Sequence, residues 1–588
     1  MPQLAGLITP LNLDEWVLVH WSSPPTTGEG DRGHAVFMDS HGEIYLHQNQ
    51  ESRRLLRYWC CAWPGEENGM HIGHLLTRAA LRWPERPAWL QGNQVITFRQ
   101  AEARVNRLAH ALAGLGATAG DRIGMLLPNC YQGLETILAP MKGGMAVVPM
   151  NARLHPEEHA YMLNDSGARI LIYGADFRTH LEAMRPSLTT VEHCICVGDP
   201  AGDALDFEDV LVGQPETPPE VMIEPDDLAW IFYTSGTTGR PKGAMLTQRN
   251  LLAMVELFLL DLNPAVATDV LLHAAAITHG SGCSIFHHIA RGAASAFPAT
   301  RSFDPPQIFA AIQRYRVTTM FLAPTMVHML TQSPARTDYD LSSLHTIFYG
   351  GGPMYVEQLQ EALRTFGPIF VQLFGQGESP MCITSLPKEA HITAGDPVKE
   401  RRLASAGRET TGMCVRIVDD DDHELPANEH GEIVVRGDLV MRGYWNNPEA
   451  TAETLRHGWH HTGDVGYLDE DGYLYITDRK KDMIISGGAN IYPREIEEVI
   501  CTHPSVLEVS VVGVPDEKWG ESVKALVVTR PGMSVSETEI IEHCRRGLAS
   551  YKKPSSVEFL EALPKNAYGK ILKRELREPY WRGQARRV

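Results

Sequence analysis

Helical and strand-like segments alternate from Ile72 to about residue 370, and this alternation constrains the fold more than any other feature of the chain. Residues 98–115 carry apolar side chains at helical spacing and end among glycines. A short apolar strand follows and ends at Pro128. Alternation of this kind is typical of layered α/β domains, so we predict a fold of the α/β class.

The chain has 588 residues, which is too long for one ordinary domain. We predict a large layered domain at 70–478, with a β-rich subdomain built from strands near 415–419 and 431–435. A small, mobile α+β domain at 479–588 follows, with a helix that begins at Pro493, strands at 508–514, 523–528 and 557–560, and a helix near 537–548. Residues 1–69 show weak periodicity and are interpreted as an N-terminal extension of unknown role.

Charge and composition exclude several classes of protein. A net charge of −19 argues against a nucleic-acid binder, which needs a basic surface. The ten cysteines form no metal-binding or paired pattern, and no secretory signal or membrane-length apolar run is present. We therefore expect a cytoplasmic protein without a transmembrane segment. Peripheral membrane contact stays open, as does the oligomeric state, for which a homodimer is plausible.

A buried strand at 227–234 runs directly into a loop rich in glycine and hydroxyl residues, and this junction is the strongest functional signal. The loop residues are Ser235, Gly236, Thr237, Thr238 and Gly239, followed by Arg240, Pro241 and Lys242. Glycines let the backbone approach a ligand closely, while the hydroxyls and the lysine can bind phosphate oxygens. The order of residues differs from the Walker A loop, in which Ser or Thr follows the lysine.

Further glycine-rich or charged segments follow at wide intervals. They are Tyr349-Gly350-Gly351-Gly352-Pro353, Phe374-Gly375-Gln376-Gly377-Glu378, the Asp464 segment HHTGD, Arg479 to Lys481, Gly487-Gly488, and PKNAYGK ending at Lys570. Taken singly, each is equally compatible with a turn, an exposed carboxylate or a solvated charge. The functional prediction therefore depends on the number and the order of these segments.

Together, YTSGTTGRPKGA at 233–244 and these segments resemble the adenylate-forming superfamily, from about residue 72 to the C-terminus. The superfamily comprises acyl- and aryl-CoA synthetases, peptide-synthetase adenylation domains and beetle luciferases. The resemblance implies Mg²⁺ as cofactor, with ATP and CoA as co-substrates.

The resemblance also implies a role for each residue. Thr234 and Glu378 would bind Mg²⁺, and Lys242, Glu378 and Lys570 would be catalytic. The loop 234–239, Gly350 to Pro353, Phe374 to Gly377, Asp464 and Arg479 would bind the nucleotide, with Phe374 stacked on adenine. Lys481 would be the hinge, and Gly487 and Gly488 would line the CoA channel. His279, Gly280, Tyr349 and Gly350 would border the acyl group, and residues 320–327 are further candidates. Gly377 replaces the superfamily's threonine, which puts one phosphate hydrogen bond in doubt.

The expected function is that of an acyl-CoA synthetase. A carboxylic acid, fatty or another medium-to-long acyl, would be activated to acyl-AMP with release of pyrophosphate, and then transferred to CoA. Three alternatives stay open: a stand-alone enzyme that loads a carrier protein, an aryl-CoA ligase, and a non-catalytic protein that binds nucleotide or acyl groups.

Overall fold

A computed structural model describes residues 70–582 except 235–239, 301, 480, 481, 488 and 566–570. It also describes the backbone of three N-terminal strands, β1 (Trp16–Ser22), β2 (His34–Asp39) and β3 (Ile44–His47), which pair as an antiparallel sheet. The rest of the N-terminal extension predicted at 1–69 lies outside the described residues. No helix in the described part of the chain has the length and apolar character needed to cross a bilayer.

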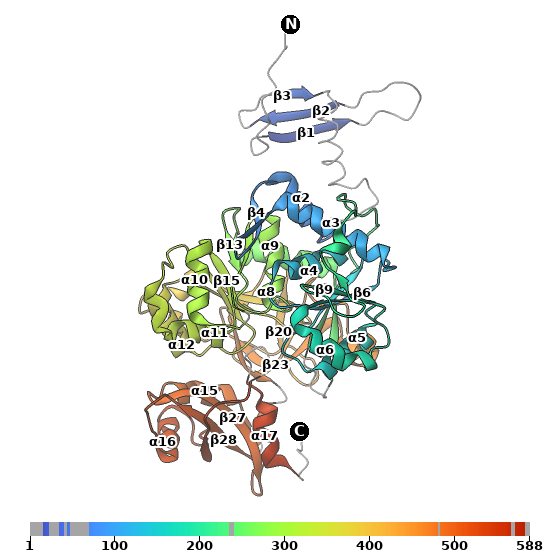
Figure 1. Ribbon diagram of the computed structural model, residues 1–588. Coiled ribbons are helices and arrows are strands. Elements are labelled where there is room, and N and C mark those ends of the chain that lie inside the picture. Colours follow the sequence, from blue (N-terminus) through green and yellow to red (C-terminus); the bar gives the residue numbers. More distant parts are fainter. Residues whose placement is uncertain are drawn as a thin grey trace.

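Two large sheets form the body of the molecule (Figure 1). The first has the order β10 (Leu205–Asp206), β9 (His193–Val197), β8 (Ile170–Gly174), β6 (Arg122–Leu126), β7 (Ala146–Pro149), β11 (Leu228–Thr234), β12 (Lys242–Thr247). The second has the order β19 (Arg408–Glu409), β18 (Thr384–Leu386), β17 (Phe370–Phe374), β16 (Thr346–Gly350), β15 (Thr319–Leu322), β13 (Val270–Leu272), β14 (Ala294–Phe297), β4 (Pro87–Gln91), β5 (Gln94–Thr97). Inner strands of both sheets are parallel, as the helix–strand alternation predicts.

Helices cover the sheets and also fill the space between them. α3 (Phe98–Gly114) confirms the helix predicted at 98–115, and Thr97 closes a capping box at its start. α4 (Tyr131–Lys142) is buried almost all around and contacts both β6 and β4, so it lies between the two sheets. The other helices of this layer and of the outer faces are α2 (His74–Arg82), α5 (Pro156–Ser166), α6 (Arg178–Met184), α7 (Gln248–Leu257), α8 (Gly280–Cys283), α9 (Ile285–Ala290), α10 (Pro305–Tyr315), α11 (Pro324–Gln332) and α12 (Val356–Phe366).

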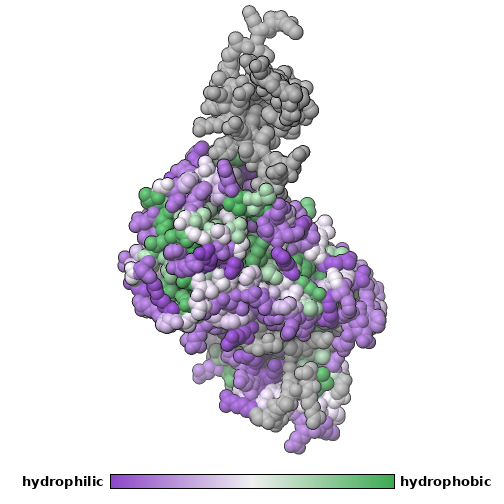
Figure 2. All heavy atoms as spheres, turned by 90° about the vertical axis from the view of Figure 1, so that its right-hand side faces the viewer, coloured by the Kyte–Doolittle hydropathy of each residue, from purple (hydrophilic) through white to green (hydrophobic). Residues whose placement is uncertain are grey.

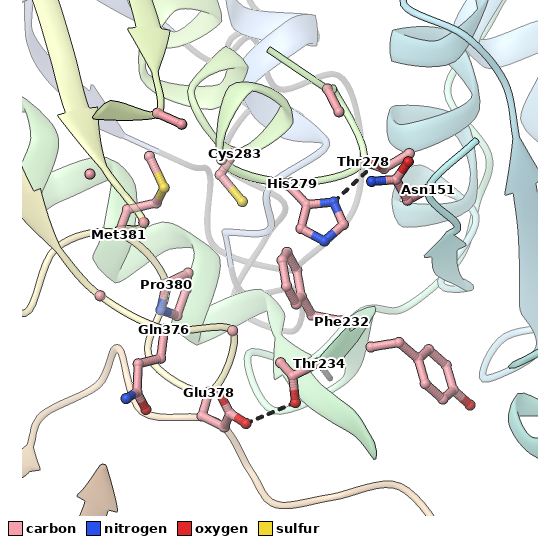
Figure 3. A pocket seen from close by; sticks show the side chains of 18 of the residues that line it. Asn151, Phe232, Thr234, Thr278, His279, Cys283, Gln376, Glu378, Pro380 and Met381 are labelled. Carbon is pink, nitrogen blue, oxygen red and sulfur yellow. Dashed lines mark hydrogen bonds between the residues drawn. The ribbon is translucent and has the colours of Figure 1, made fainter. Parts of the chain in front are cut away.

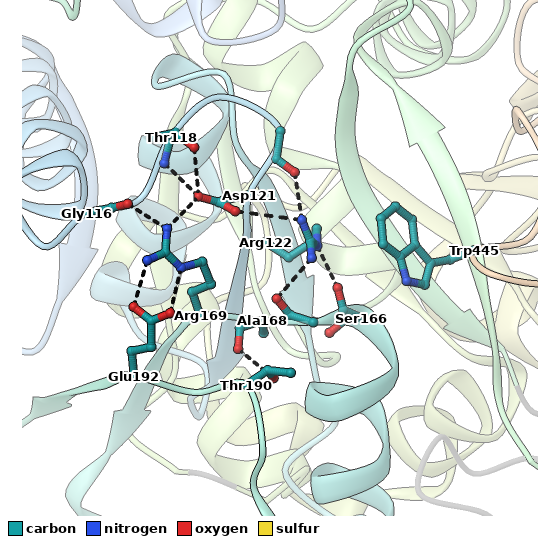
Figure 4. Close-up of polar contacts among 12 residues, drawn as sticks. Gly116, Thr118, Asp121, Arg122, Ser166, Ala168, Arg169, Thr190, Glu192 and Trp445 are labelled. Atoms are coloured by element: carbon teal, nitrogen blue, oxygen red, sulfur yellow. Dashed lines mark hydrogen bonds and ion pairs between the residues drawn. The ribbon is translucent and has the colours of Figure 1, made fainter.

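An arginine cluster at the start of β6 and β8 connects the first sheet to the segment that carries Trp445 (Figure 4). Arg169 bridges Asp121 and Glu192, with nitrogen–oxygen distances of 3.2 Å and 2.7 Å. Arg122 donates to the backbone oxygen of Ser166 at 2.6 Å, and its guanidinium lies 5.0 Å from the ring centre of Trp445. Arg169 is thus paired with two carboxylates and Arg122 with a backbone oxygen and a ring, so the cluster stabilises this part of the fold.

The predicted β-rich subdomain is confirmed as a third sheet. It contains β20 (Cys414–Val418), β21 (Gly431–Arg436), β23 (Trp459–Leu468), β22 (Leu455–Arg456) and β24 (Leu474–Arg479), and it is flanked by the short helices α13 (Pro397–Arg402) and α14 (Pro448–Thr454). β23 and β24 form an antiparallel hairpin. On the face shown in Figure 2, hydrophilic residues predominate and apolar ones form scattered patches.

The last part of the chain forms an α+β unit with its own apolar core. Its elements are β25 (Ile484–Ser486), β26 (Ala489–Ile491), α15 (Pro493–Cys501), β27 (Val506–Asp516), β28 (Gly520–Thr529), α16 (Glu537–Gly547), β29 (Ser556–Phe559) and α17 (Lys573–Trp581). The predicted elements are all present, and Pro493 is the first residue of its helix as expected. In Figure 1 this unit lies below the large domain.

A buried polar group joins this unit to the large domain. Lys573 Nζ lies 3.2 Å from Asp478 Oδ2 and 3.0 Å from Glu497 Oε1. The hydroxyl of Tyr355, just before α12, donates to Glu497 Oε2 at 3.1 Å. Because these groups are buried and paired, they hold the two parts in the orientation seen here.

Candidate active site

A cavity of about 790 Å³ lies where the ends of β11, β16 and β17 meet the third sheet. Its wall includes one polar region, around Lys242, Glu378 and Arg479, and one mainly apolar region, around Phe232, Phe321 and Met381. Figure 3 shows the side chains that converge on it.

Glu378 is the centre of the polar region. It is 9% exposed, and its Oε1 accepts hydrogen bonds from Thr234 Oγ1 at 3.0 Å and from the hydroxyl of Tyr444 at 2.7 Å. Burial and the nearby carboxylate raise the pKa of Tyr444 far above its ordinary value, so the hydroxyl remains a donor. Lys242 Nζ lies 5.2 Å from the ring centre of Tyr444. Thr234, Lys242 and Glu378 are therefore brought together, as the sequence predicts.

The donor set at Glu378 suits a hard divalent cation. Among the described residues, both hydrogen bonds go to Oε1, which leaves Oε2 for a cation. No cluster of three or more metal-ligating side chains occurs in the described part of the chain. Mg²⁺ commonly binds through one or two carboxylates, water and substrate phosphates, so one carboxylate beside Thr234 and in the same cavity as Lys242 fits this ion.

Asp464 anchors a second polar group on β23. Its Oδ2 accepts from Gln376 Nε2 at 2.6 Å, and its Oδ1 lies 3.3 Å from Arg479 Nε. Gln376 also donates to the backbone oxygen of Thr462 at 2.9 Å. The Asp464 carboxylate raises the pKa of Arg479, which therefore stays charged. Three residues predicted to contact the nucleotide are thus joined by a hydrogen bond and an ion pair.

Two of the predicted aromatic residues are buried in apolar cores. Tyr349 is fully buried in the core between β16 and the outer helices, where its hydroxyl contacts His391 at 3.0 Å and donates to Gln372 at 3.2 Å. Phe374 packs in the main core between the sheets. Neither lines the cavity, whereas Gly350 and Gly375 do. Their strand positions turn these side chains into the cores, and the contacts of Tyr349 with substrate and of Phe374 with adenine stay predictions.

Glycines at the end of β16 and directly after it let the backbone itself form part of the wall. Gly350 and Gly351 line the cavity, and a β-carbon at Gly350 would lie 2.4 Å from the backbone oxygen of Leu373 on β17. Any larger residue would push these paired strands apart. Gly352 and Pro353 are not among the residues that line the cavity.

His279 borders the apolar region. Its imidazole Nδ1 lies 3.0 Å from Thr278 Oγ1, and its ring meets that of Phe232 edge to face, with centroids 4.8 Å apart (Figure 3). Burial lowers the pKa of His279 to about 3, so the imidazole is uncharged at neutral pH. Gly280, predicted beside it, also lines the cavity, as do Phe321, Ala323 and Met326 of the predicted run 320–327.

Sequence reasoning missed Phe232 and Tyr444. Phe232 precedes Thr234 by two residues on β11, and successive side chains of a strand alternate between its faces. The strand pattern could therefore have placed Phe232 on the same face as Thr234. No local signal marks Tyr444, which reaches Glu378 only through the packing of the third sheet on the large domain.

Several predicted residues lie outside the described part: Ser235, Gly236, Thr237, Thr238, Gly239, Lys481, Gly488 and Lys570. Gly487 is described, and its backbone N–H donates to the oxygen of Trp519 at 2.7 Å. Its φ is +58°, and a β-carbon there would lie 2.6 Å from the Trp519 ring. The turn at Gly487 thus requires glycine.

Comparison with known proteins agrees with this geometry. Residues 76–445 match the AMP-binding enzyme family, and residues 495–570 match the AMP-binding enzyme C-terminal domain. A feruloyl-CoA synthase of Amycolatopsis sp is 38% identical over 87% of this chain and 99% of its own length. A medium/long-chain fatty acid–CoA ligase of Mycobacterium tuberculosis is 35% identical over 88% of this chain and 91% of its own.

Solved structures resemble the chain in the same way. The anthranilate-CoA ligase AuaEII, in complex with anthranoyl-AMP, has a TM-score of 0.80 and 27% identity, over 88% of this chain and 98% of its own. The match spans both the large domain and the C-terminal unit. The chain therefore belongs to the AMP-binding enzyme family of adenylate-forming ligases.

Proposed function

We propose that the protein is an ATP-dependent acid–CoA ligase that joins an apolar carboxylic acid to AMP and then to CoA. One observation carries the proposal: a single cavity brings Lys242, Glu378 and Arg479 into reach of an apolar region lined by Phe232 and Phe321. A nucleotide and an apolar acid can therefore meet there. The related CoA ligases support CoA as the acceptor. We place the reaction in the cytoplasm, where ATP and CoA are available.

In the first half-reaction, a carboxylate oxygen attacks the α-phosphorus of ATP, and the bond from that phosphorus to the pyrophosphate oxygen breaks. Lys242 offsets the growing charge on the phosphates, and Asp464 accepts hydrogen bonds from the ribose hydroxyls. Mg²⁺, held by Glu378 with Thr234 beside it, would supply further charge neutralisation on the phosphates. We assign Lys570 to this step by the resemblance of its segment.

In the second half-reaction, the CoA thiolate attacks the acyl carbon and AMP leaves with the bonding electrons. The uncharged His279 and its aromatic neighbours keep water and charge away from the acyl-adenylate. The paired group at Tyr355, Glu497 and Lys573 must open for the C-terminal unit to change its orientation, with Lys481 as the proposed hinge and Gly487 and Gly488 as the proposed lining of the CoA channel.

The experiment that tests this function supplies ATP, Mg²⁺, CoA and a panel of aliphatic and aromatic acids to the full-length protein. Pyrophosphate and AMP are measured by coupled assay, and the CoA thioester by mass spectrometry. Release of both products together with a thioester is the expected result. Absence of pyrophosphate with every acid would contradict the proposal.

Two variants refine the test. Asp464→Asn should raise the KM for ATP while leaving the KM for the acid near its original value. Lys570→Ala should abolish acid-dependent pyrophosphate exchange while sparing thioester formation from supplied acyl-AMP. Lys399→Ala, an exposed lysine on α13, is the matched control and should change neither half-reaction.

A further inference from the structure

Gly377 is packed so closely that a side chain there would require its neighbours to move. A β-carbon there would lie 2.4 Å from Thr234 Cγ2 and 2.6 Å from Phe232 Cδ1, both far inside ordinary contact distance. Thr234 cannot easily rotate away, because its Oγ1 donates to Glu378 at 3.0 Å. The space that a side chain at position 377 would need is therefore taken by the Phe232 ring and the Thr234 methyl.

The Phe232 ring is held in this place by its neighbours. It stacks with the buried ring of Trp230, with centroids 6.3 Å apart and an angle of 25°. It also meets the imidazole of His279 edge to face, with centroids 4.8 Å apart and an angle of 73° (Figure 3). Such offset and edge-to-face pairs are the favourable arrangements of aromatic rings.

A third ring extends this wall of the cavity. A β-carbon at Gly280 would lie 2.7 Å from Phe321 Cε1 and 3.1 Å from the Met381 sulfur, so the Phe321 ring is seated against the Gly280 backbone. Phe232, His279 and Phe321 therefore line the same region, and we call them the ring wall. His279 is uncharged, so the ring wall presents aromatic surface without a formal charge.

We propose that the absence of a side chain at Gly377 is what admits Phe232 to the cavity, and that the ring wall selects a planar aromatic acid over a flexible aliphatic one. The proposal rests on the ligase function given above and names its substrate class. A rigid ring loses little conformational freedom on binding, whereas an alkyl chain must be ordered bond by bond. Each aromatic contact adds about two- to tenfold to the preference.

The test compares trans-cinnamic acid with nonanoic acid, which have equal numbers of carbon atoms, by kcat/KM for CoA thioester formation. The wild-type protein should favour cinnamate. Phe232→Leu should lower kcat/KM for cinnamate about fivefold and leave that for nonanoate within about twofold. Phe366→Leu, a phenylalanine on α12 that packs away from the cavity, is the control and should change neither value.

A double-variant cycle tests the coupling of positions 377 and 232. Gly377→Ala should reduce the preference for cinnamate as Phe232→Leu does, because the added methyl displaces the ring. In the Phe232→Leu background, Gly377→Ala should reduce the preference for cinnamate much less, because the leucine side chain can move aside. The KM for ATP and the circular-dichroism melting temperature report whether each variant still folds and binds nucleotide.

The outcomes separate this inference from the proposed function. A preference for nonanoate, equal losses on both acids in Phe232→Leu, or additive effects in the cycle would overturn the ring wall as the selecting element. Thioester formation would still occur in those cases. No thioester or pyrophosphate with any acid would instead contradict the ligase function itself.

Discussion

The hydroxyl of Tyr444 offers a single-atom test of the polar region. Tyr444→Phe deletes the donor that lies 2.7 Å from Glu378 Oε1 and keeps the ring beside Lys242. A hydrogen bond to a charged group contributes about 1.5–3 kcal/mol. Thr234 still donates to the same oxygen, so we take the lower end, about 1.5 kcal/mol. This corresponds to roughly a tenfold change in an equilibrium constant.

The assay is acid-dependent pyrophosphate exchange, titrated with Mg²⁺ at fixed ATP and with ATP at saturating Mg²⁺. We expect the half-saturating Mg²⁺ concentration to rise about tenfold, because the carboxylate must then be ordered by the ion itself. The KM for the acid should stay near its original value. The matched control is Tyr580→Phe, which removes a tyrosine hydroxyl that donates to Glu558 in the C-terminal unit. An unchanged Mg²⁺ dependence in Tyr444→Phe would refute the assignment of Glu378 as the ion-binding group.

Three further predictions follow from the same contacts. Lys242→Ala should lower kcat/KM for pyrophosphate exchange about 10²–10³-fold with little change in melting temperature. Retained activity would contradict the catalytic role of Lys242. Tyr355→Phe removes the bond to the buried Glu497, so the population of the present orientation of the C-terminal unit, relative to all others, should fall about tenfold or more. Small-angle scattering and inter-domain fluorescence transfer measure these populations, and unchanged populations would contradict the prediction. Burial lowers the pKa of His279 to about 3 and of His288 to about 4, so the unfolded chain, with ordinary values near 6.5, binds more protons between those limits. The free energy of unfolding is therefore highest above pH 6.5 and falls by about 1.4 kcal/mol per pH unit for each of the two rings as the pH is lowered. Urea unfolding at pH 7, 5.5 and 4.5 should show this decrease, and a free energy of unfolding that does not change with pH would be inconsistent with it.

Gly377 shows how one departure from a family pattern acquires a physical meaning. From the sequence it predicts only the loss of a hydroxyl near a phosphate. In the structure, its neighbours are Thr234 and Phe232, whose side chains fill the space where a threonine side chain would stand. Glycine in place of threonine at position 377 therefore changes the space available to neighbouring side chains as well as the hydrogen bonding. The change in space affects the acid-binding region of the cavity, where the Phe232 ring lies.

The sequence by itself determined the class of fold and most of the elements. The helix predicted at 98–115 is observed at Phe98–Gly114, and the helix predicted from Pro493 begins at that residue. It also indicated which segments are candidates for the chemistry, because glycine-rich turns act over a few neighbouring positions. These signals are local, so one sequence suffices to read them.

Only the tertiary structure decided which side chains enter the cavity. Tyr349 and Phe374 sit beside the predicted glycines, yet their strands turn them into two different cores. Tyr444 and Gly377 take their places at the site through contacts between segments far apart in the chain, as in the bond from Thr234 to Glu378 across 144 residues. Neighbouring strand residues face opposite sides, and the packing of sheet on sheet selects the side that faces the ligand.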